Sequence, residues 1–194
     1  ADISFEDAAA IMLKGLTAYY LLRRTFAVGQ GTTLLWHAAA GGTGLIACQW
    51  AKALGATVIG TGGSAEKAEL AGQNGCDHVI NYREEDFAKR VRELTDGAGV
   101  EVVYDGNGKD TFAASLDCLK PLGMMVSFGN ASGPIAIPDL GILARKGSLF
   151  LTRPTGATYF ATREELVKGA AELFAVMRSG AVKARIGQRF PLAK

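Results

Sequence analysis

The stretch LLWHAAAGGTGLIACQWAKALGATVIGTGG, residues 34–63, decides the fold class of this chain. An apolar run leads through small residues into a helical pattern, and a second apolar run follows. Ala39, Gly41 and Gly44 fill the three fixed positions of the G-x-G-x-x-G motif, with alanine in the first. Gly41 lets the backbone approach a pyrophosphate, and Gly44 lets the helix pack closely on the strand. We therefore expect a dinucleotide-binding unit; the alternative is a glycine-rich turn that serves packing alone.

The alternation of short apolar runs and helical patterns continues along the chain. We predict strands at residues 32–36, 57–61, 79–81, 100–104, 124–128 and 148–152. We predict helices between them at 45–54, 65–73, 85–94 and 111–119, and a long amphipathic helix at 163–179. Strands that alternate with helices indicate a parallel sheet with both faces covered, and right-handed crossovers make it doubly wound. The expected fold class is α/β, a Rossmann-type doubly wound six-stranded parallel sheet with helices on both faces.

Two helical segments precede the first predicted strand. Ser4 and Asp7 form a capping-box pattern at the start of the first segment, and a second helical stretch is expected over residues 16–24. Residues 1–31 are thus a helical lead-in, and residues 32–194 form one domain. Five glycines fall just after predicted helices, where a left-handed residue often ends a helix. They are Gly55, Gly75, Gly97, Gly123 and Gly180.

Composition and charge restrict the class of partner. The 194 residues carry a net charge of only +2, with basic and acidic residues interleaved, so nucleic acid is not an expected partner. Cys48, Cys76 and Cys118 are odd in number and far apart, which favours reduced thiols and a cytoplasmic location. His37 and His78 are the only histidines, so no metal site is expected. No apolar run approaches the roughly 20 residues that span a bilayer.

The end of the second predicted strand indicates which dinucleotide fits. An NAD site offers an acidic residue there, about 20 residues after the glycine motif, to bind the ribose 2′-hydroxyl. This chain has Gly62, Gly63 and Ser64 instead, with Lys67 one helical turn later. Ser64 can donate to a 2′-phosphate and Lys67 can add a positive charge, so NADPH is the expected cofactor. Alternatively, Ser64 is an ordinary helix cap and Lys67 a solvated surface lysine.

Several segments together carry a resemblance to a known family. They read AAAGGTGLIACQWAKALGA, GSAEKAELA, HVINYREEDF, VYDGNGKDTF, SLDCLKPLGMMVSFGNASG and KGSLFLTRP. The chain resembles the NADPH-dependent quinone oxidoreductases, in the zeta-crystallin-like, zinc-free branch of the medium-chain dehydrogenase/reductase superfamily. The resemblance covers the cofactor-binding domain only, and it implies that residues 1–31 lead in from a GroES-like catalytic domain that this chain lacks. We therefore expect this chain alone to bind cofactor but to reduce little quinone.

The resemblance also implies roles for individual residues. Thr17, in GLTAYY, matches a threonine that lies beside the nicotinamide in the family. Lys67 and Tyr82 resemble the residues that hold the 2′-phosphate. From the residues alone, Tyr82 can also be a strand-end aromatic packed on a helix, and Thr17 a plain helix residue.

Two loops complete the site that the resemblance implies. The loop of residues 105–108, which includes Asn107, approaches the cofactor, and Phe128 and Gly129 lie along its nicotinamide half. No catalytic acid or base and no metal ligand is expected. The expected cofactor-binding residues are Thr17, Ala40, Gly41, Gly42, Thr43, Gly44, Gly63, Ser64, Lys67, Tyr82, Asn107, Phe128 and Gly129.

The implied reaction is hydride transfer from NADPH to a quinone, a small-molecule acceptor. Two alternatives stay open: an NADPH-dependent reductase of enones or 2-haloacrylate-type substrates, and a non-catalytic NADPH-binding protein of the crystallin type. The predicted last strand, residues 148–152, is apolar and should lie at a sheet edge, which a protein must pair or cover. The resemblance points to pairing of two copies there. We therefore expect a homodimer through this strand.

Overall fold

The computed structural model describes residues 3–191. Its centre is a six-stranded sheet in the order β3-β2-β1-β4-β5-β6, and all neighbouring strands are parallel. The strands are β1 (Thr33–Trp36), β2 (Thr57–Gly62), β3 (His78–Asn81), β4 (Val100–Asp105), β5 (Leu119–Ser127) and β6 (Phe150–Thr152). The direction of winding reverses between β1 and β4, which is the doubly wound arrangement. The predicted fold class is confirmed.

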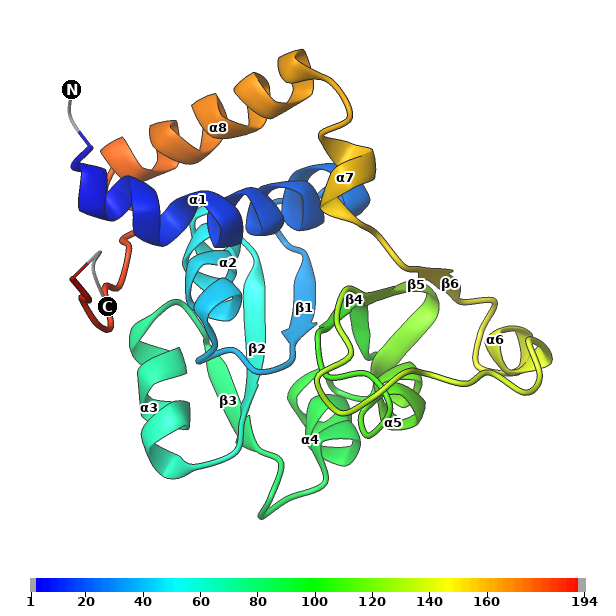
Figure 1. Ribbon diagram of the computed structural model, residues 1–194. Coiled ribbons are helices and arrows are strands. Elements are labelled where there is room, and N and C mark those ends of the chain that lie inside the picture. Colours follow the sequence, from blue (N-terminus) through cyan, green and yellow to red (C-terminus); the bar gives the residue numbers. More distant parts are fainter. Residues whose placement is uncertain (1–2, 192–194) are drawn as a thin grey trace.

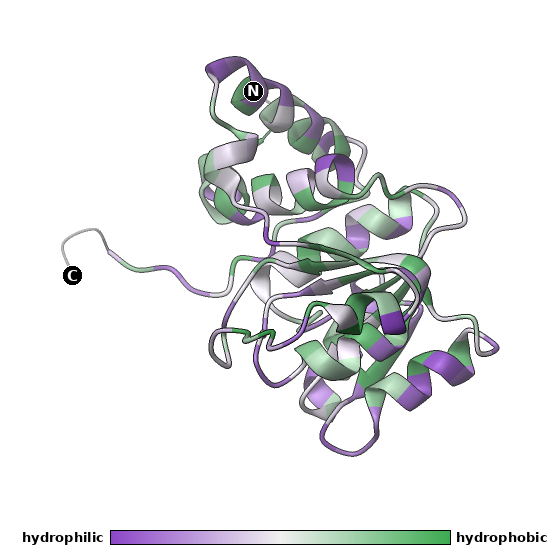
Figure 2. Ribbon diagram, turned by 90° about the vertical axis from the view of Figure 1, so that its right-hand side faces the viewer, coloured by the Kyte–Doolittle hydropathy of each residue, from purple (hydrophilic) through white to green (hydrophobic). Residues whose placement is uncertain are grey.

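Helices cover both faces of the sheet (Figure 1). They are α1 (Phe5–Tyr19), the π-helix η1 (Tyr20–Thr25), α2 (Gly42–Ala53), α3 (Ala65–Gln73), α4 (Phe87–Leu94), α5 (Phe112–Cys118), α6 (Gly141–Arg145), α7 (Gly156–Tyr159) and α8 (Arg163–Arg178). Leu34 and Trp36 of β1 pack in one core with α1, α2 and α8, whereas Leu35 packs in a second core with α4 and α5. The side chains of successive strand residues thus pack into the helix layers on opposite faces of the sheet. Hydrophobic segments gather around the sheet, and hydrophilic ones lie mainly on peripheral helices and loops (Figure 2).

Residues 16–24 are helical, as predicted, but they continue the first helix and do not form a separate one. No glycine or proline interrupts these residues, and α1 passes directly into η1 at Tyr20. The Phe26 N–H donates to the carbonyl of Leu21, five residues back, at 3.2 Å. In this wider π-helical turn, three consecutive residues are buried: Tyr20, Leu21 and Leu22. A regular amphipathic helix would turn part of such a run to solvent.

α1 belongs to the same packed layer as α2 and α8. It begins after Ser4, whose Oγ accepts the N–H of Asp7 at 3.0 Å, as the capping pattern predicts. Its Gly15 lies against α8, because a Cβ there would come within 2.7 Å of both methyl groups of Leu173. A boundary at residue 31 stays a prediction.

Four of the five predicted helix-ending glycines have positive φ, namely Gly55, Gly75, Gly97 and Gly180. The prediction for Gly123 is wrong, because β5 already begins at Leu119, where we expected a helix to end, and the left-handed residue is Leu122 with φ 62°. Gly123 serves a close approach instead. A Cβ there would lie 2.8 Å from the carbonyl oxygen of Lys120.

The last strand is shorter than predicted. Ser148 has φ 56°, a left-handed conformation that cannot continue into a strand, so β6 begins at Phe150. β6 pairs with β5 through Met124–Phe150, Met125–Leu151 and Val126–Thr152. It ends the sheet order, and the Phe150 side chain is exposed.

Candidate functional site

The turn between β1 and α2 has the geometry that the glycine motif predicts. Gly41 is the N-cap of α2, with extended φ −75° and ψ 166°, and it offers no side-chain cap. A Cβ on Gly44 would lie 2.5 Å from the carbonyl oxygen of Ala39, so only glycine permits this helix–strand approach. The first bond of the helix runs from the Leu45 N–H to the Gly41 carbonyl at 2.9 Å. The N–H groups of residues 42–44 therefore precede the helical ladder and are available to an anion.

A buried histidine lies directly beneath this turn. The ring of His37 is bonded through Nδ1 to Thr61 Oγ1 at 3.1 Å and through Nε2 to Ser115 Oγ at 2.9 Å. Thr61 Oγ1 also accepts the N–H of Ala38 at 3.3 Å, so the end of β2 supports the start of the glycine turn. Burial lowers the pKa of His37 from 6.5 to about 4, against the opposing charge of Asp105. The imidazole is thus neutral at physiological pH and holds three elements together by hydrogen bonds.

A buried carboxylate fixes the loop after β4. Asp105 Oδ1 accepts the N–H of Asn107 at 2.7 Å and the N–H of Gly108 at 3.0 Å. Its Oδ2 accepts the hydroxyl of Thr111 at 2.7 Å. Both oxygens of this side chain thereby accept hydrogen bonds from one turn, which holds Asn107 at the carboxyl edge of the sheet. This is where doubly wound sheets bind their ligands.

A cavity of about 140 Å³ opens beside the glycine turn, at the carboxyl ends of β1 and β2. Its lining brings together six of the predicted residues, Ala40, Gly41, Gly63, Lys67, Tyr82 and Asn107, with Ala38, Thr61 and Gly62. None of these nine residues carries a carboxylate. The cavity therefore presents backbone groups, a phenol, an amide and one ammonium group.

Tyr82 and Lys67 flank this cavity in different ways. A Cβ on Gly63 would meet the Tyr82 hydroxyl at 2.6 Å, so the phenol lies across the glycine at the end of β2. Ser64 is the N-cap of α3, and its Oγ accepts the N–H of Lys67 at 3.3 Å. This cap holds the backbone of Lys67, while the lysine itself is exposed. The arrangement suits a phosphate placed between the phenol and the ammonium group.

The loops after β4 and β5 lie side by side. The Phe128 N–H donates to the Asp105 carbonyl at 2.8 Å, and a Cβ on Gly106 would lie 3.2 Å from the Phe128 ring. Arg153 was missed by the sequence reasoning as a supporting residue. Its Nη1 donates to the carbonyls of Ser127 at 3.0 Å and Gly129 at 2.9 Å, which ties the end of β5 to the segment after β6.

The other seven predicted residues lie outside the lining of the 140 Å³ cavity: Thr17, Gly42, Thr43, Gly44, Ser64, Phe128 and Gly129. The Thr17 hydroxyl donates to the carbonyl of Leu13 at 2.9 Å, within its own helix. Gly42 and Thr43 form the first turn of α2. The sequence signals for the missed His37 and Arg153 are their positions one residue after β1 and β6, where a side chain can reach the carboxyl edge.

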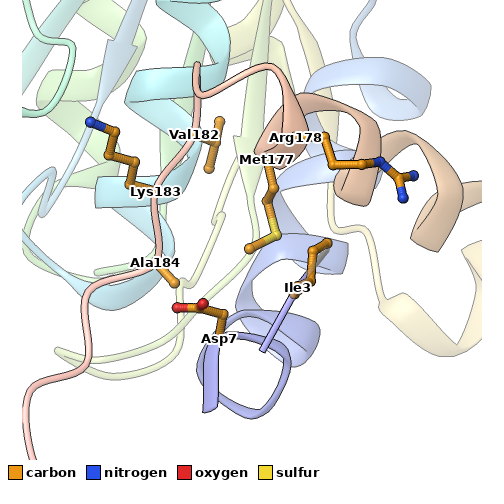
Figure 3. A pocket seen from close by; sticks show the side chains of 7 residues that line it. All are labelled: Ile3, Asp7, Met177, Arg178, Val182, Lys183 and Ala184. Atoms are coloured by element: carbon orange, nitrogen blue, oxygen red, sulfur yellow. The ribbon is translucent and has the colours of Figure 1, made fainter. Parts of the chain in front are cut away.

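A separate cavity of about 200 Å³ lies between the start of α1 and the end of α8 (Figure 3). Ile3, Asp7, Met177, Arg178, Val182, Lys183 and Ala184 line it. None of the predicted cofactor residues is among them. This cavity is not part of the carboxyl-edge site.

Comparisons with known proteins agree with this geometry. The family model described as zinc-binding dehydrogenase matches residues 42–175. The chain is 58% identical over 192 residues to a quinone oxidoreductase of Salmonella typhimurium, covering 98% of this chain and 59% of the relative. It is 49% identical over 197 residues to a 2-haloacrylate reductase of Burkholderia sp., covering 98% and 58%. A crystal structure of Escherichia coli quinone oxidoreductase complexed with NADPH superposes with a TM-score of 0.92 at 56% identity, covering 95% of this chain and 57% of that one.

The chain thus spans about 59% of the length of the curated quinone oxidoreductases that it matches. Within residues 3–191, no group of three or more His, Cys, Asp and Glu side chains could hold a metal ion, so these residues do not fit the zinc in the family's description. None of the described helices is long and apolar enough to cross a membrane. The resemblance to the quinone oxidoreductases is confirmed by the relatives, and the chain belongs to the zinc-binding dehydrogenase family.

Proposed function

We propose that this chain binds NADPH as the hydride donor for reduction of a quinone. The observation that carries the proposal is the cavity at the glycine turn, which has Lys67 and Tyr82 on its lining and no carboxylate. A carboxylate at the end of β2 would repel a 2′-phosphate, whereas an ammonium group attracts it. The relatives named quinone oxidoreductase, at 56–58% identity, support the same assignment.

The residues of this chain bind and orient the cofactor. The N–H groups at the start of α2 bind the diphosphate, because they are unpaired and the helix dipole is positive there. Lys67 and Tyr82 bind the 2′-phosphate, and Asn107 closes the cavity from the β4 loop. Phe128 and Thr17 border the nicotinamide half. NADPH itself supplies the hydride, so the protein needs no acid or base for that transfer.

The cofactor assignment is tested by Lys67→Ala. Loss of a charge-assisted contact should weaken NADPH binding by about 1–3 kcal/mol and leave NADH binding almost unchanged. Titration calorimetry with both cofactors measures this directly. Lys89→Ala, an exposed lysine on α4, is the matched control and should change neither affinity. Equal affinities of the unmutated chain for NADPH and NADH would contradict the proposal.

A second candidate function is reduction of 2-haloacrylate-type or other enone substrates. The relative named 2-haloacrylate reductase, at 49% identity, favours it. NADPH oxidation by the whole protein against quinones, enones and 2-haloacrylates separates the two functions. Binding of NADPH without turnover of any of them would instead indicate the crystallin-type, non-catalytic alternative.

We further infer a homodimer in the cytoplasm. β6 ends the sheet order, so one side of it has no strand partner within residues 3–191, and Phe150 is 57% exposed. Pairing of two β6 strands about a twofold axis would cover this apolar edge. Three free, buried cysteines fit a reducing compartment.

A further inference from the structure

The glycine at position 42 is not explained by the motif or by the backbone. G-x-G-x-x-G leaves this position open, and Gly42 is absent from the residues with positive φ. A Cβ at Gly42 would instead meet Lys14 of α1, with Cε at 2.7 Å, Cδ at 2.8 Å and Nζ at 2.8 Å. The absence of a side chain at Gly42 therefore leaves room for Lys14. Its ammonium group lies at the first residue of α2, the phosphate-binding helix.

A cation in this place is electrostatically unfavourable by itself, because the N-terminal end of a helix carries positive partial charge. α2 has no acidic residue in its first turn and no side-chain cap. The cavity of about 220 Å³ that borders Gly42 is also lined by Lys183 and Arg185, and by no carboxylate. Three cationic residues and a helix dipole thus face one space. An anion bound there would relieve the repulsion between them.

Two neighbouring residues connect this space to the candidate cofactor site. Gly41 lines the 140 Å³ cavity that contains Lys67, and Gly42 lines the 220 Å³ cavity that contains Lys14. Thr17, the residue expected beside the nicotinamide, lies three positions after Lys14 on α1, and residues so spaced share one helix face. In the proposed complex, with Lys67 at the 2′-phosphate and Thr17 beside the nicotinamide, Lys14 adjoins the stretch between these two regions through Gly42 and α1. The diphosphate is the part of a dinucleotide that would lie there.

We propose that the Lys14 ammonium group binds the diphosphate of the cofactor, together with the N–H groups at the start of α2. The inference rests on the proposed function, since it assumes a dinucleotide in this site. It assigns the two lysines different tasks. Lys67 distinguishes NADPH from NADH through the 2′-phosphate, whereas Lys14 contacts a group that both cofactors share.

The experiment compares Lys14→Met with Lys67→Ala, using calorimetry with NADPH, NADH and adenosine 2′-monophosphate. Lys14→Met should weaken NADPH and NADH alike by about tenfold, the scale of one charged hydrogen bond, and should leave adenosine 2′-monophosphate unchanged because it has no diphosphate. Lys67→Ala should weaken NADPH and adenosine 2′-monophosphate but not NADH. Lys14→Arg, which keeps the charge, should restore most of the affinity.

Lys89→Met is the matched control, because Lys89 is an exposed lysine on α4 that lines neither of the two cavities. It should change either affinity less than twofold. Thermal unfolding of each variant checks that the fold is intact. If Lys14→Met leaves NADPH and NADH affinities unchanged, or if Lys89→Met has the same effect, the assignment to Lys14 is overturned while the proposed function stands. If the unmutated chain binds neither cofactor, both fail.

Discussion

The buried His37 makes a specific prediction about stability in acid. Its pKa is lowered by burial from 6.5 to about 4 in the folded protein, whereas the unfolded chain should have the ordinary value of about 6.5. Between these values the unfolded chain binds a proton that the folded chain does not. Stability is therefore fully present above pH 6.5 and falls as the pH falls toward 4. The folded and unfolded pKa values of His37 differ by about 2.5 units, and each unit corresponds to about 1.4 kcal/mol. The free energy of unfolding should therefore fall by roughly 3 kcal/mol in total, and about 2 kcal/mol of this fall occurs by pH 5.

Carboxylates contribute in a lower range. Partial burial acts to raise the pKa values of Asp77 and Glu101, but the hydrogen bonds from Lys52 and Lys120, together with backbone N–H groups, outweigh it, so both pKa values are lowered. Their stabilisation is present above the ordinary values of 3.8 and 4.5 and is lost as the pH falls below them. Between pH 6.5 and 5, the contribution of His37 to the pH dependence of stability can therefore be separated from that of Asp77 and Glu101.

The assay is urea unfolding at several pH values, followed by the fluorescence of Trp36 and Trp50. His37→Gln keeps a donor and an acceptor but removes the titration, so it should lower stability at pH 7 by about 1–2 kcal/mol. Between pH 7 and 5, the free energy of unfolding of this variant should fall by about 2 kcal/mol less than that of the unmutated chain. His78→Gln, at an exposed position, should retain the full loss. Parallel stability curves for His37→Gln and the unmutated chain would refute the reasoning.

The remaining predictions concern packing and assembly. Gly44→Ala should destabilise the chain by about 1–3 kcal/mol, because its Cβ would meet the Ala39 carbonyl oxygen at 2.5 Å, whereas Gly72→Ala in α3 meets nothing within 4 Å and should stabilise by up to about 1 kcal/mol. Urea unfolding measures both, and a destabilised Gly72→Ala or a neutral Gly44→Ala would contradict the contact argument. Phe150→Lys should convert a dimer paired through β6 into monomers in sedimentation at tens of micromolar; a monomeric unmutated chain would rule out that interface.

The parts of the fold that the sequence predicts well are those that local patterns determine. β1, β2 and β4 are buried parallel strands, so each reads as a continuous apolar run, and their bounds agree with the prediction to within one residue. The first half of β5 was missed because Pro121 and Gly123 resemble a turn. η1 was missed as well, since the residues that favour a π-helix also favour an α-helix. The short helices α6 and α7 carry too few residues to show a period.

In the candidate site, too, some residues could be recognised in the sequence and others could not. The glycine turn, the missing acid and Lys67 lie within 30 residues of one another and can be recognised in the sequence. The bond from His37 to Ser115 joins residues 78 positions apart, and that from Arg153 to Gly129 joins residues 24 apart. Such pairs depend on how the strands are ordered in the sheet. Local patterns carry no signal for that order. The sequence could therefore place His37 and Arg153 just after two strands, but their hydrogen-bond partners could be found only in the folded structure.

The charges around the glycine turn follow one electrostatic principle. A dinucleotide would bring several negative charges, and the cations proposed to meet them, Lys14 and Lys67, are exposed and stay hydrated when the site is empty. The support beneath the turn is fully buried, where an unpaired charge would be costly in the empty protein. A neutral imidazole bonded to two hydroxyls fixes the turn without that cost. Replacing His37 by Lys should therefore destabilise the chain more than replacing it by Gln, because the buried ammonium group would have no opposite charge bonded to it among Thr61 and Ser115.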